Sequence, residues 1–367
     1  MSLRGRLSLC QWSADRLRAR HLVGNHLSWQ CLTPKQAIRA VVAHCEIRPV
    51  PWSVKFTVDA QERYAAWLGR SFDAVQDFGS YVVASHTNSG WEQVRPGHFR
   101  DYFGVVWNKT MDRTLGVVEA PPLTSPTLEG YEFPDADVIP VYDIIEENRR
   151  RYPDRFHMIS IGFSLFERAW SLVGIEPLMM YLIDEPGFVH DLLDSITQYN
   201  LKVIANAARM NGVDCVHFGD DWGSQRGPLI HPEMWQRFIQ PRYARMCQAS
   251  RAAGLLVSLH CCGNVEPIME QIYACGTDVF DPFQPEAMNI WHLREQFRGR
   301  MAFWGGLSVQ HTFPHGTPDD VRREVKALLE KMAPGGGYIL SPSHSLTRDI
   351  PPENIQAFLD VAGTQHP

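Results

Sequence analysis

Short runs rich in β-branched and apolar residues alternate with longer amphipathic stretches along most of this chain. Short apolar runs bounded by Gly, Pro and polar clusters are typical of buried parallel strands, and the longer stretches show the 3.6-residue spacing of helices. Alternation of the two predicts an α/β fold, and eight strands predict a (β/α)8 barrel, the TIM barrel. The eight candidate strands are residues 51–56, 81–85, 157–164, 215–221, 255–262, 278–283, 302–308 and 338–344.

Three amphipathic stretches carry clear helix signals. The stretch 33–46 begins with Thr33, a good N-cap, and Pro34, which suits the first helical position, so we expect a helix before the first strand. The stretch 231–254 is amphipathic but interrupted by proline. The stretch 317–337 begins with a Thr-Pro pair followed by two acids and stops at three glycines, the pattern of a complete helix.

One segment does not fit the strand and helix repeat. Residues 101–135 contain two β-rich runs that flank polar turns, followed by a Pro-rich loop. Two such runs with turn residues between them are typical of a hairpin. We therefore predict a β-hairpin insertion after an early strand, near the mouth of the barrel.

The first 31 residues differ in composition from the rest, with five Arg against one Asp. A basic, acid-poor leader is typical of a transit peptide, and a misplaced start codon or an added leader would look the same. We interpret residues 1–31 as an extension outside the fold. The remaining residues, 32–367, have the length of one barrel domain.

Net charge, hydrophobicity and the distribution of cysteines limit the kinds of partner and the cellular compartment that we expect. A net charge of −6 gives no electrostatic footprint for nucleic acid, so a small molecule or a protein is the expected partner. A homodimer stays open as an alternative. No apolar run reaches the roughly 18–20 residues that span a bilayer. Eight cysteines scattered without framework spacing favour a reducing compartment, and we expect a cytoplasmic location.

Active sites of such barrels lie at the carboxyl ends of the strands, where this chain places many polar residues. Asp220 and Asp221 are adjacent, so on a strand only one of them faces the mouth, where it could orient a substrate, act as acid or base, or complete a metal shell. Alternatively the pair caps the following loop through backbone N–H groups. The strand-end residues are Asp220, Asp221, His260, Cys262, Asp281, Gln284, Ser308, Gln310 and His344.

The stretch "SLHCCGN" contains the most specific of these signals. His260 and Cys262 are two residues apart, so on an extended segment they share one face and Cys261 points the other way. Imidazole and thiolate together suit Zn²⁺, whose catalytic sites take three protein ligands. His344 is our first candidate for the third ligand, and the oxygen-donor alternatives are Asp220, Asp221 and Glu286. The competing interpretation is a small buried thiol beside a hydrogen-bonded core histidine.

Glycine-rich stretches complete the candidate site. Glycines surround Trp222, which predicts a shaped loop over the mouth, and we expect Trp222, Gln284 and Ser308 to contact the substrate. The glycine clusters in 304–308 and 334–340 match neither GxGxxG nor the P-loop, so no nucleotide site is predicted.

Four segments together resemble the uroporphyrinogen decarboxylase superfamily: residues 217–243, 259–285, 303–325 and 335–360. The likeness runs from about Leu32 to Leu359. The resemblance implies a (β/α)8 barrel and one of two chemistries. One is decarboxylation of a porphyrinogen, and the other is zinc-dependent methyl transfer between a corrinoid protein and a thiol or similar acceptor.

The two chemistries imply different residues. For decarboxylation, His344 matches a functional histidine of the last strand, but the arginine-rich RQAGR motif is absent, and we find only Arg48 in its place. For methyl transfer, His260 and Cys262 match the zinc motif, whereas the further cysteine of the last strand is replaced here by Ser343 and His344. We therefore expect a zinc-dependent, corrinoid-linked methyltransferase. The alternatives are a uroporphyrinogen decarboxylase-type enzyme and a non-catalytic small-molecule binding barrel.

Overall fold

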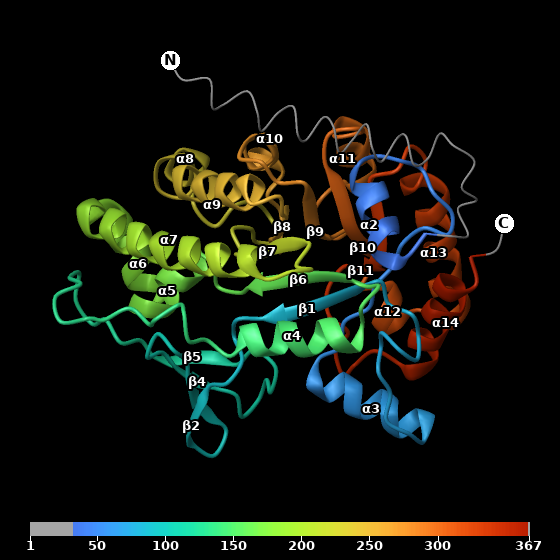
Figure 1. Ribbon diagram of the computed structural model, residues 1–367, viewed down its shortest axis with the longest axis horizontal. Coiled ribbons are helices and arrows are strands. Elements are labelled where there is room, and N and C mark those ends of the chain that lie inside the picture. Colours follow the sequence, from blue (N-terminus) through green and yellow to red (C-terminus); the bar gives the residue numbers. More distant parts are fainter. Residues whose placement is uncertain (1–31, 366–367) are drawn as a thin grey trace.

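The computed structural model describes residues 32–365, so the predicted extension 1–31 lies outside the described residues. Seven parallel strands form one curled sheet in the order β1-β6-β7-β8-β9-β10-β11 (Figure 1). Each buried strand lies close to its predicted range. The strands are β1 (Val82–His86), β6 (Phe156–Ile161), β7 (Cys215–Gly219), β8 (Leu256–His260), β9 (Val279–Phe283), β10 (Ala302–Leu307) and β11 (Tyr338–Pro342).

The predicted strand 51–56 is an extended segment rather than a strand of this sheet. Its Ser53 N–H donates to the carbonyl of Leu340 on β11 across 3.0 Å, and the N–H of Tyr81, just before β1, donates to the carbonyl of Trp52 across 3.0 Å. Isolated bridges replace a continuous ladder, and the segment begins with a proline, which has no N–H to donate. The predicted eight-stranded barrel is thus found in part. Seven strands form the sheet, and the extended segment 51–56 forms hydrogen bonds with β11 at one edge and with Tyr81, just before β1, at the other.

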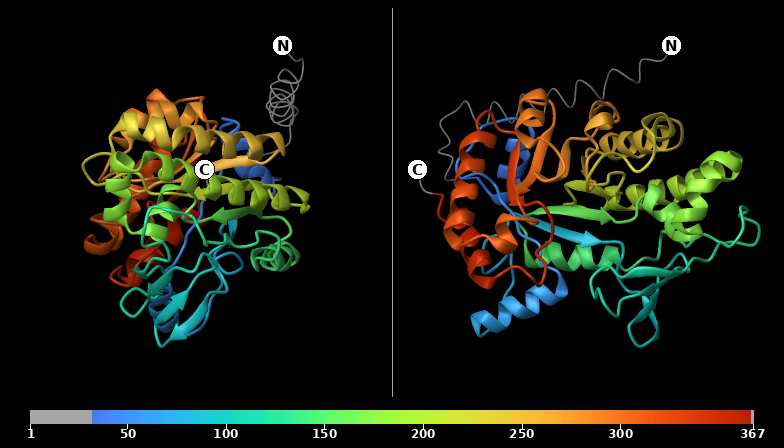
Figure 2. Two further views of the ribbon diagram at one scale, coloured as in Figure 1. Left: turned by 90° about the vertical axis from the view of Figure 1, so that its left-hand side faces the viewer. Right: turned by 180° about the vertical axis from the view of Figure 1, so that it is seen from behind.

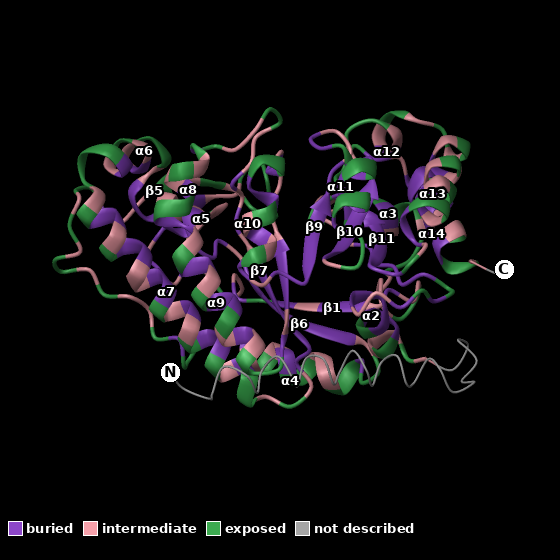
Figure 3. Ribbon diagram, turned by 90° about the horizontal axis from the view of Figure 1, so that it is seen from above, coloured by how far each residue is buried: buried purple, intermediate pink, exposed green. Residues whose placement is uncertain are grey.

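Helices surround the sheet, and Figure 3 shows the buried strands in the centre with exposed helix faces outside. None of the helices in residues 32–365 is both long and apolar enough to cross a membrane. The helices are α2 (Pro34–Val42), α3 (Val58–Leu68), α4 (Val141–Arg151), α5 (Phe166–Val173), α6 (Ile175–Asp184), α7 (Pro186–Arg209), α8 (Pro232–Phe238), α9 (Gln240–Ala252), η2 (Glu266–Ile268), α10 (Met269–Ala274), α11 (Ile290–Gln296), α12 (Thr312–His315), α13 (Pro318–Met332) and α14 (Pro352–Gly363).

The helix signals in the sequence are largely confirmed. Thr33 and Thr317 each form a capping box at the start of α2 and α13. The predicted stretch 231–254 is two helices, α8 and α9, because Pro241 removes a backbone donor near their junction at Ile239.

Helix α2 closes the amino end of the sheet. Asp214, just before β7, forms ion pairs with Lys35 at 3.0 Å and Arg39 at 2.7 Å on this helix. Burial of each large aliphatic side chain between α2 and the strands stabilises the folded state by about 1.5–3 kcal/mol. The amino ends of the strands are therefore covered by α2. The apolar cluster here contains Ala37, Ile38 and Val41 of α2 with the strand residues Val82, Phe156, Met158, Val279 and Ile339.

The predicted hairpin insertion is larger than expected and starts earlier. It is a four-stranded antiparallel sheet between β1 and α4, made of β2 (Glu92–Arg95), β3 (His98–Arg100), β4 (Val106–Asn108) and β5 (Val117–Ala120). Figure 2 shows it as a separate layer beside the main sheet. Two short strands were missed because their polar residues lack the apolar alternation that marks a half-buried strand.

The insertion is fastened to the segment that follows β6. Asp101 and Arg168, each almost fully buried, form an ion pair of 2.6 Å, and the rings of Trp107 and Phe163 lie 4.8 Å apart between centroids. These contacts place the insertion next to the carboxyl end of β6, as predicted for a segment near the mouth.

Candidate functional site

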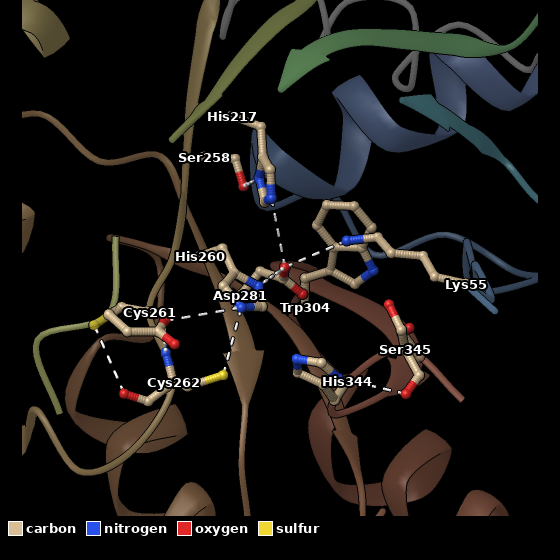
Figure 4. Close-up of polar contacts among 12 residues, drawn as sticks. Lys55, His217, Ser258, His260, Cys261, Cys262, Asp281, Trp304, His344 and Ser345 are labelled. Carbon is tan, nitrogen blue, oxygen red and sulfur yellow. Dashed lines mark hydrogen bonds and ion pairs between the residues drawn. The ribbon is translucent and has the colours of Figure 1, made fainter. Parts of the chain in front are cut away.

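His260, Cys262 and His344 come together at the carboxyl ends of β8 and β11. The Sγ atom of Cys262 lies 3.4 Å from Nε2 of His260, and the rings of His260 and His344 lie 5.7 Å apart between centroids. One donor atom from each of the three residues lies within 4.8 Å of the other two. Figure 4 shows the three side chains facing one another from two separate segments.

Cys261 points away from this group, as the period of two predicts. Its side chain is fully buried, and its Sγ accepts the backbone N–H of Trp222 at 3.2 Å. Burial raises the pKa of the Cys261 thiol well above its usual range. The adjacent cysteines therefore have separate roles: Cys261 packs in the core, and Cys262 faces the mouth.

Asp220 and Asp221 point in different directions. Asp220 is fully buried and caps α5, accepting the backbone N–H groups of Phe166 at 2.9 Å and Glu167 at 2.7 Å. Burial raises the pKa of Asp220 to about 6. Asp221 instead accepts the N–H of Cys262 at 2.7 Å. Asp220 thus caps α5, which precedes it in the chain, rather than the loop that follows it, and Asp221 lies beside Cys262.

Asp281 lies behind His260. Its Oδ2 atom is 2.9 Å from Nδ1 of His260, 3.5 Å from Nζ of Lys55 and 3.7 Å from Nε2 of His217. Burial alone would raise the pKa of Asp281, but the Lys55 ammonium and the His260 hydrogen bond hold it well below its usual range. The Lys55 ammonium also lies 4.3 Å from the ring centroid of Trp304.

A second group of possible metal donors shares one residue with the first. His217, His260 and Asp281 also bring one donor atom each within 4.8 Å of one another. Both groups use His260, through different ring nitrogens, because Nδ1 faces Asp281 and Nε2 faces Cys262.

The residues expected to contact the substrate are all buried. Trp222 is 1% exposed and packs against Trp235 and Tyr243, so its ring supports the core rather than lining the mouth. Gln284, which is 4% exposed, accepts the N–H of Gly263 at 2.6 Å through its side-chain oxygen.

Ser308 is also buried, and its hydroxyl donates to Glu286. The backbone N–H of Gln310 donates to the same Glu286 oxygen at 3.3 Å. In this structure Ser308 and Glu286 tie together the loops after β10 and β9, and Glu286 is not among the residues that converge with His260.

Sequence reasoning missed Lys55, His217 and Glu167. Lys55 and His217 lie within predicted strands, where the period of two could have placed them on an inward face. Glu167 gave no sequence signal, because its position depends on the start of α5. Burial raises the pKa of Glu167 well above its usual range, and the negative charges of Asp221 and Asp220 raise it further.

Comparison with known proteins agrees with this architecture. Residues 105–365 match the family described as Uroporphyrinogen decarboxylase (URO-D). A uroporphyrinogen decarboxylase of Syntrophotalea carbinolica is 24% identical over 256 residues, which cover 68% of this chain and 72% of that protein. The methylcobamide:CoM methyltransferase MtaA of Methanosarcina barkeri is 25% identical over 191 residues, and the match spans about half of each protein, 52% of this chain and 53% of the methyltransferase.

A solved methyltransferase from Methanosarcina mazei has the same fold. It superimposes with a TM-score of 0.70 over 90% of this chain and 98% of that structure, at 18% sequence identity. The family match covers most of the chain, and the fold agrees with it. The chain therefore belongs to the uroporphyrinogen decarboxylase family.

Proposed function

We propose that this chain is a zinc-dependent methyltransferase that moves a methyl group between a corrinoid protein and a small thiol-like acceptor. The observation that carries the proposal is the convergence of His260, Cys262 and His344 at the open end of the sheet. Two imidazoles and one thiol form a soft donor set that suits zinc, and three protein ligands leave a fourth position for water or substrate.

The spacing of the donor atoms fits zinc. Tetrahedral zinc with bonds of about 2.0–2.3 Å keeps its ligand atoms about 3.3–3.8 Å apart. The 3.4 Å between Cys262 and His260 matches this range, and all three donors lie within 4.8 Å of one another.

The chain's own residues prepare this position. Asp221 holds the backbone of Cys262, Gln284 holds that of Gly263, and the thiol is thereby directed towards His260. When bound, zinc would act as a Lewis acid that lowers the pKa of an acceptor thiol and favours its nucleophilic thiolate. The similarity to a methylcobamide:CoM methyltransferase supports a corrinoid as the methyl carrier.

Decarboxylation of a porphyrinogen is the alternative within the family, and many relatives carry that name. A substrate with several carboxylates needs several unpaired cations for recognition. Arg48 is exposed on the surface, and Lys55, which lies within the fold, is already paired with Asp281. Lys55 is therefore not free to bind a substrate carboxylate, which favours methyl transfer.

The test combines metal analysis with two activity assays. We expect about one zinc per chain, lost in Cys262→Ala, and thiol-dependent loss of methylcobalamin absorbance that is abolished in the same variant. A metal-free native protein would overturn the proposal. Porphyrinogen turnover that survives Cys262→Ala and is lost in His344→Ala would establish the decarboxylase instead. Stabilisation by a ligand without turnover in either assay would indicate a binding barrel.

A further inference from the structure

The structure assigns Asp281 as the residue that orients His260 for metal binding, with Lys55 holding Asp281 in place. This inference rests on the proposed zinc site and extends it to residues behind the ligands. Asp281 is 4% exposed, and its Oδ2 atom faces His260, Lys55 and His217 at once (Figure 4). Neither residue belongs to the group His260, Cys262 and His344.

The hydrogen bond from His260 to Asp281 decides which ring nitrogen can bind a metal. A carboxylate only accepts hydrogen bonds, so Nδ1 of His260 carries the proton that it donates across 2.9 Å. In the neutral ring Nε2 then has the free lone pair, and this atom faces Cys262 at 3.4 Å. Asp281 thereby directs His260 towards the thiol.

Lys55 distinguishes between the two groups of possible metal donors. A metal held by His217, His260 and Asp281 would need Nδ1 of His260 without its proton and a free Asp281 oxygen. The Lys55 ammonium lies 3.5 Å from that oxygen and would repel a second cation there. The group that contains Cys262 and His344 is therefore the metal site, and the inner group serves to position it.

Lys55 is itself held in place. Its ammonium lies 4.3 Å from the ring centroid of Trp304, and Nε1 of Trp304 donates to the Ser53 hydroxyl at 2.8 Å. Ser53 and Lys55 belong to the same extended segment, which contacts β11 through Ser53. The extended segment 51–56 thus supplies Lys55, the cation that lies behind the site.

Carboxylates behind a ligating histidine fix its orientation and raise its basicity, and their loss typically weakens metal binding about 10- to 100-fold. We expect Asp281→Ala to weaken zinc binding by about this factor, and Asp281→Asn, which keeps an acceptor oxygen, to weaken it less. Zinc affinity is measured by competition with a chromophoric chelator, and metal-free thermal unfolding reports the fold. If Asp281→Ala does not fold, Asp281→Asn alone carries the comparison.

The matched control is Asp278→Asn. Asp278 is also buried, immediately before β9, but it pairs with Arg251 and the N–H of Val257 at the closed end. This variant should lose stability and keep its zinc affinity. Lys55→Met should have no further effect on zinc affinity in the Asp281→Asn background, because Lys55 acts through Asp281.

The failure of this inference is distinct from failure of the proposed function. Wild-type protein that binds no zinc overturns both. Zinc that is lost in Cys262→Ala but bound with unchanged affinity by Asp281→Ala and Asp281→Asn overturns the positioning role alone. Additive effects of Lys55→Met and Asp281→Asn would overturn the link between those two residues.

Discussion

Gly223 and Gly263 pack backbone against backbone where the loops after β7 and β8 meet. A Cβ atom on Gly263 would lie 2.5 Å from the carbonyl carbon of Gly223, and one on Gly223 would lie 2.6 Å from the carbonyl oxygen of Cys262. Gly263 also has a φ of +82°, a conformation that residues with a side chain rarely adopt. The position of Cys262 therefore depends on two residues that have no side chain.

Alanine at Gly263 tests this contact. We expect Gly263→Ala to lower the free energy of unfolding by about 1–3 kcal/mol through backbone strain, and to weaken zinc binding because Cys262 is displaced. Chemical unfolding and chelator competition measure the two effects. Gly227→Ala, in the neighbouring loop after β7, is the control, since nothing beyond its own chain neighbours lies within 4 Å of its added Cβ. Equal behaviour of the two variants would contradict the prediction.

His344 should behave as a metal ligand rather than as a residue that positions one. We expect His344→Ala to weaken zinc binding by more than the roughly 100-fold that loss of an outer partner costs. His292→Ala, on an exposed helical position, is the control and should bind zinc as the wild type does. If His344→Ala keeps wild-type affinity, the third ligand must come from elsewhere, with Asp221 as the next candidate.

Glu167 should make stability depend on pH. Its pKa is raised on folding by burial and by Asp221 and Asp220, so the folded state binds this proton more tightly than the unfolded state. The stabilising contribution is complete below the unfolded pKa of about 4.3 and is lost as the pH rises through the folded pKa.

Glu167→Gln mimics the protonated carboxyl and should remove the part of this dependence that Glu167 causes, while Asp220, whose pKa burial raises to about 6, keeps its own. We expect the variant to be more stable than the wild type at high pH and to show a shallower fall in unfolding free energy as the pH rises above the unfolded pKa of about 4.3. Denaturant unfolding across that range measures the slope. Glu176→Gln, at an exposed position on α6, should leave the slope unchanged. A wild-type slope in Glu167→Gln would show that Glu167 does not contribute to the pH dependence.

The buried pair of Asp101 and Arg168 should stabilise the insertion. Arg168→Leu leaves the buried Asp101 carboxylate without its counter-ion, held only by N–H groups of Phe103, Val105 and Trp107, and should cost about 3–5 kcal/mol of unfolding free energy. The control is Arg300→Leu, which breaks an exposed pair with Glu270 and should cost less than about 1 kcal/mol. Urea unfolding measures the loss of unfolding free energy in both variants. Similar losses would mean that the buried pair stabilises the fold no more than the exposed pair does.

Local patterns predicted much of the framework. The apolar runs located all seven strands of the main sheet, and the threonine caps located α2 and α13, because strand burial and helix capping depend on neighbours along the chain. The two-residue alternation of side chains along a strand also predicted that His260 and Cys261 point to opposite faces. Local sequence patterns failed where the local conformation depended on contacts with residues far away in the sequence. Examples are the extended segment 51–56 and the polar strands β2 and β3.

The sequence by itself determined the α/β alternation, the family resemblance and the pairing of His260 with Cys262. Each of these depends on residues that are close together in the chain. Only the tertiary structure decided that His344 lies beside that pair and that Asp281 and Lys55 stand behind it. It also decided that Asp220 caps α5 while Asp221 faces the mouth. The reason is physical: a site at the ends of parallel strands is assembled from loops far apart in sequence, whose contacts exist only once the sheet has curled.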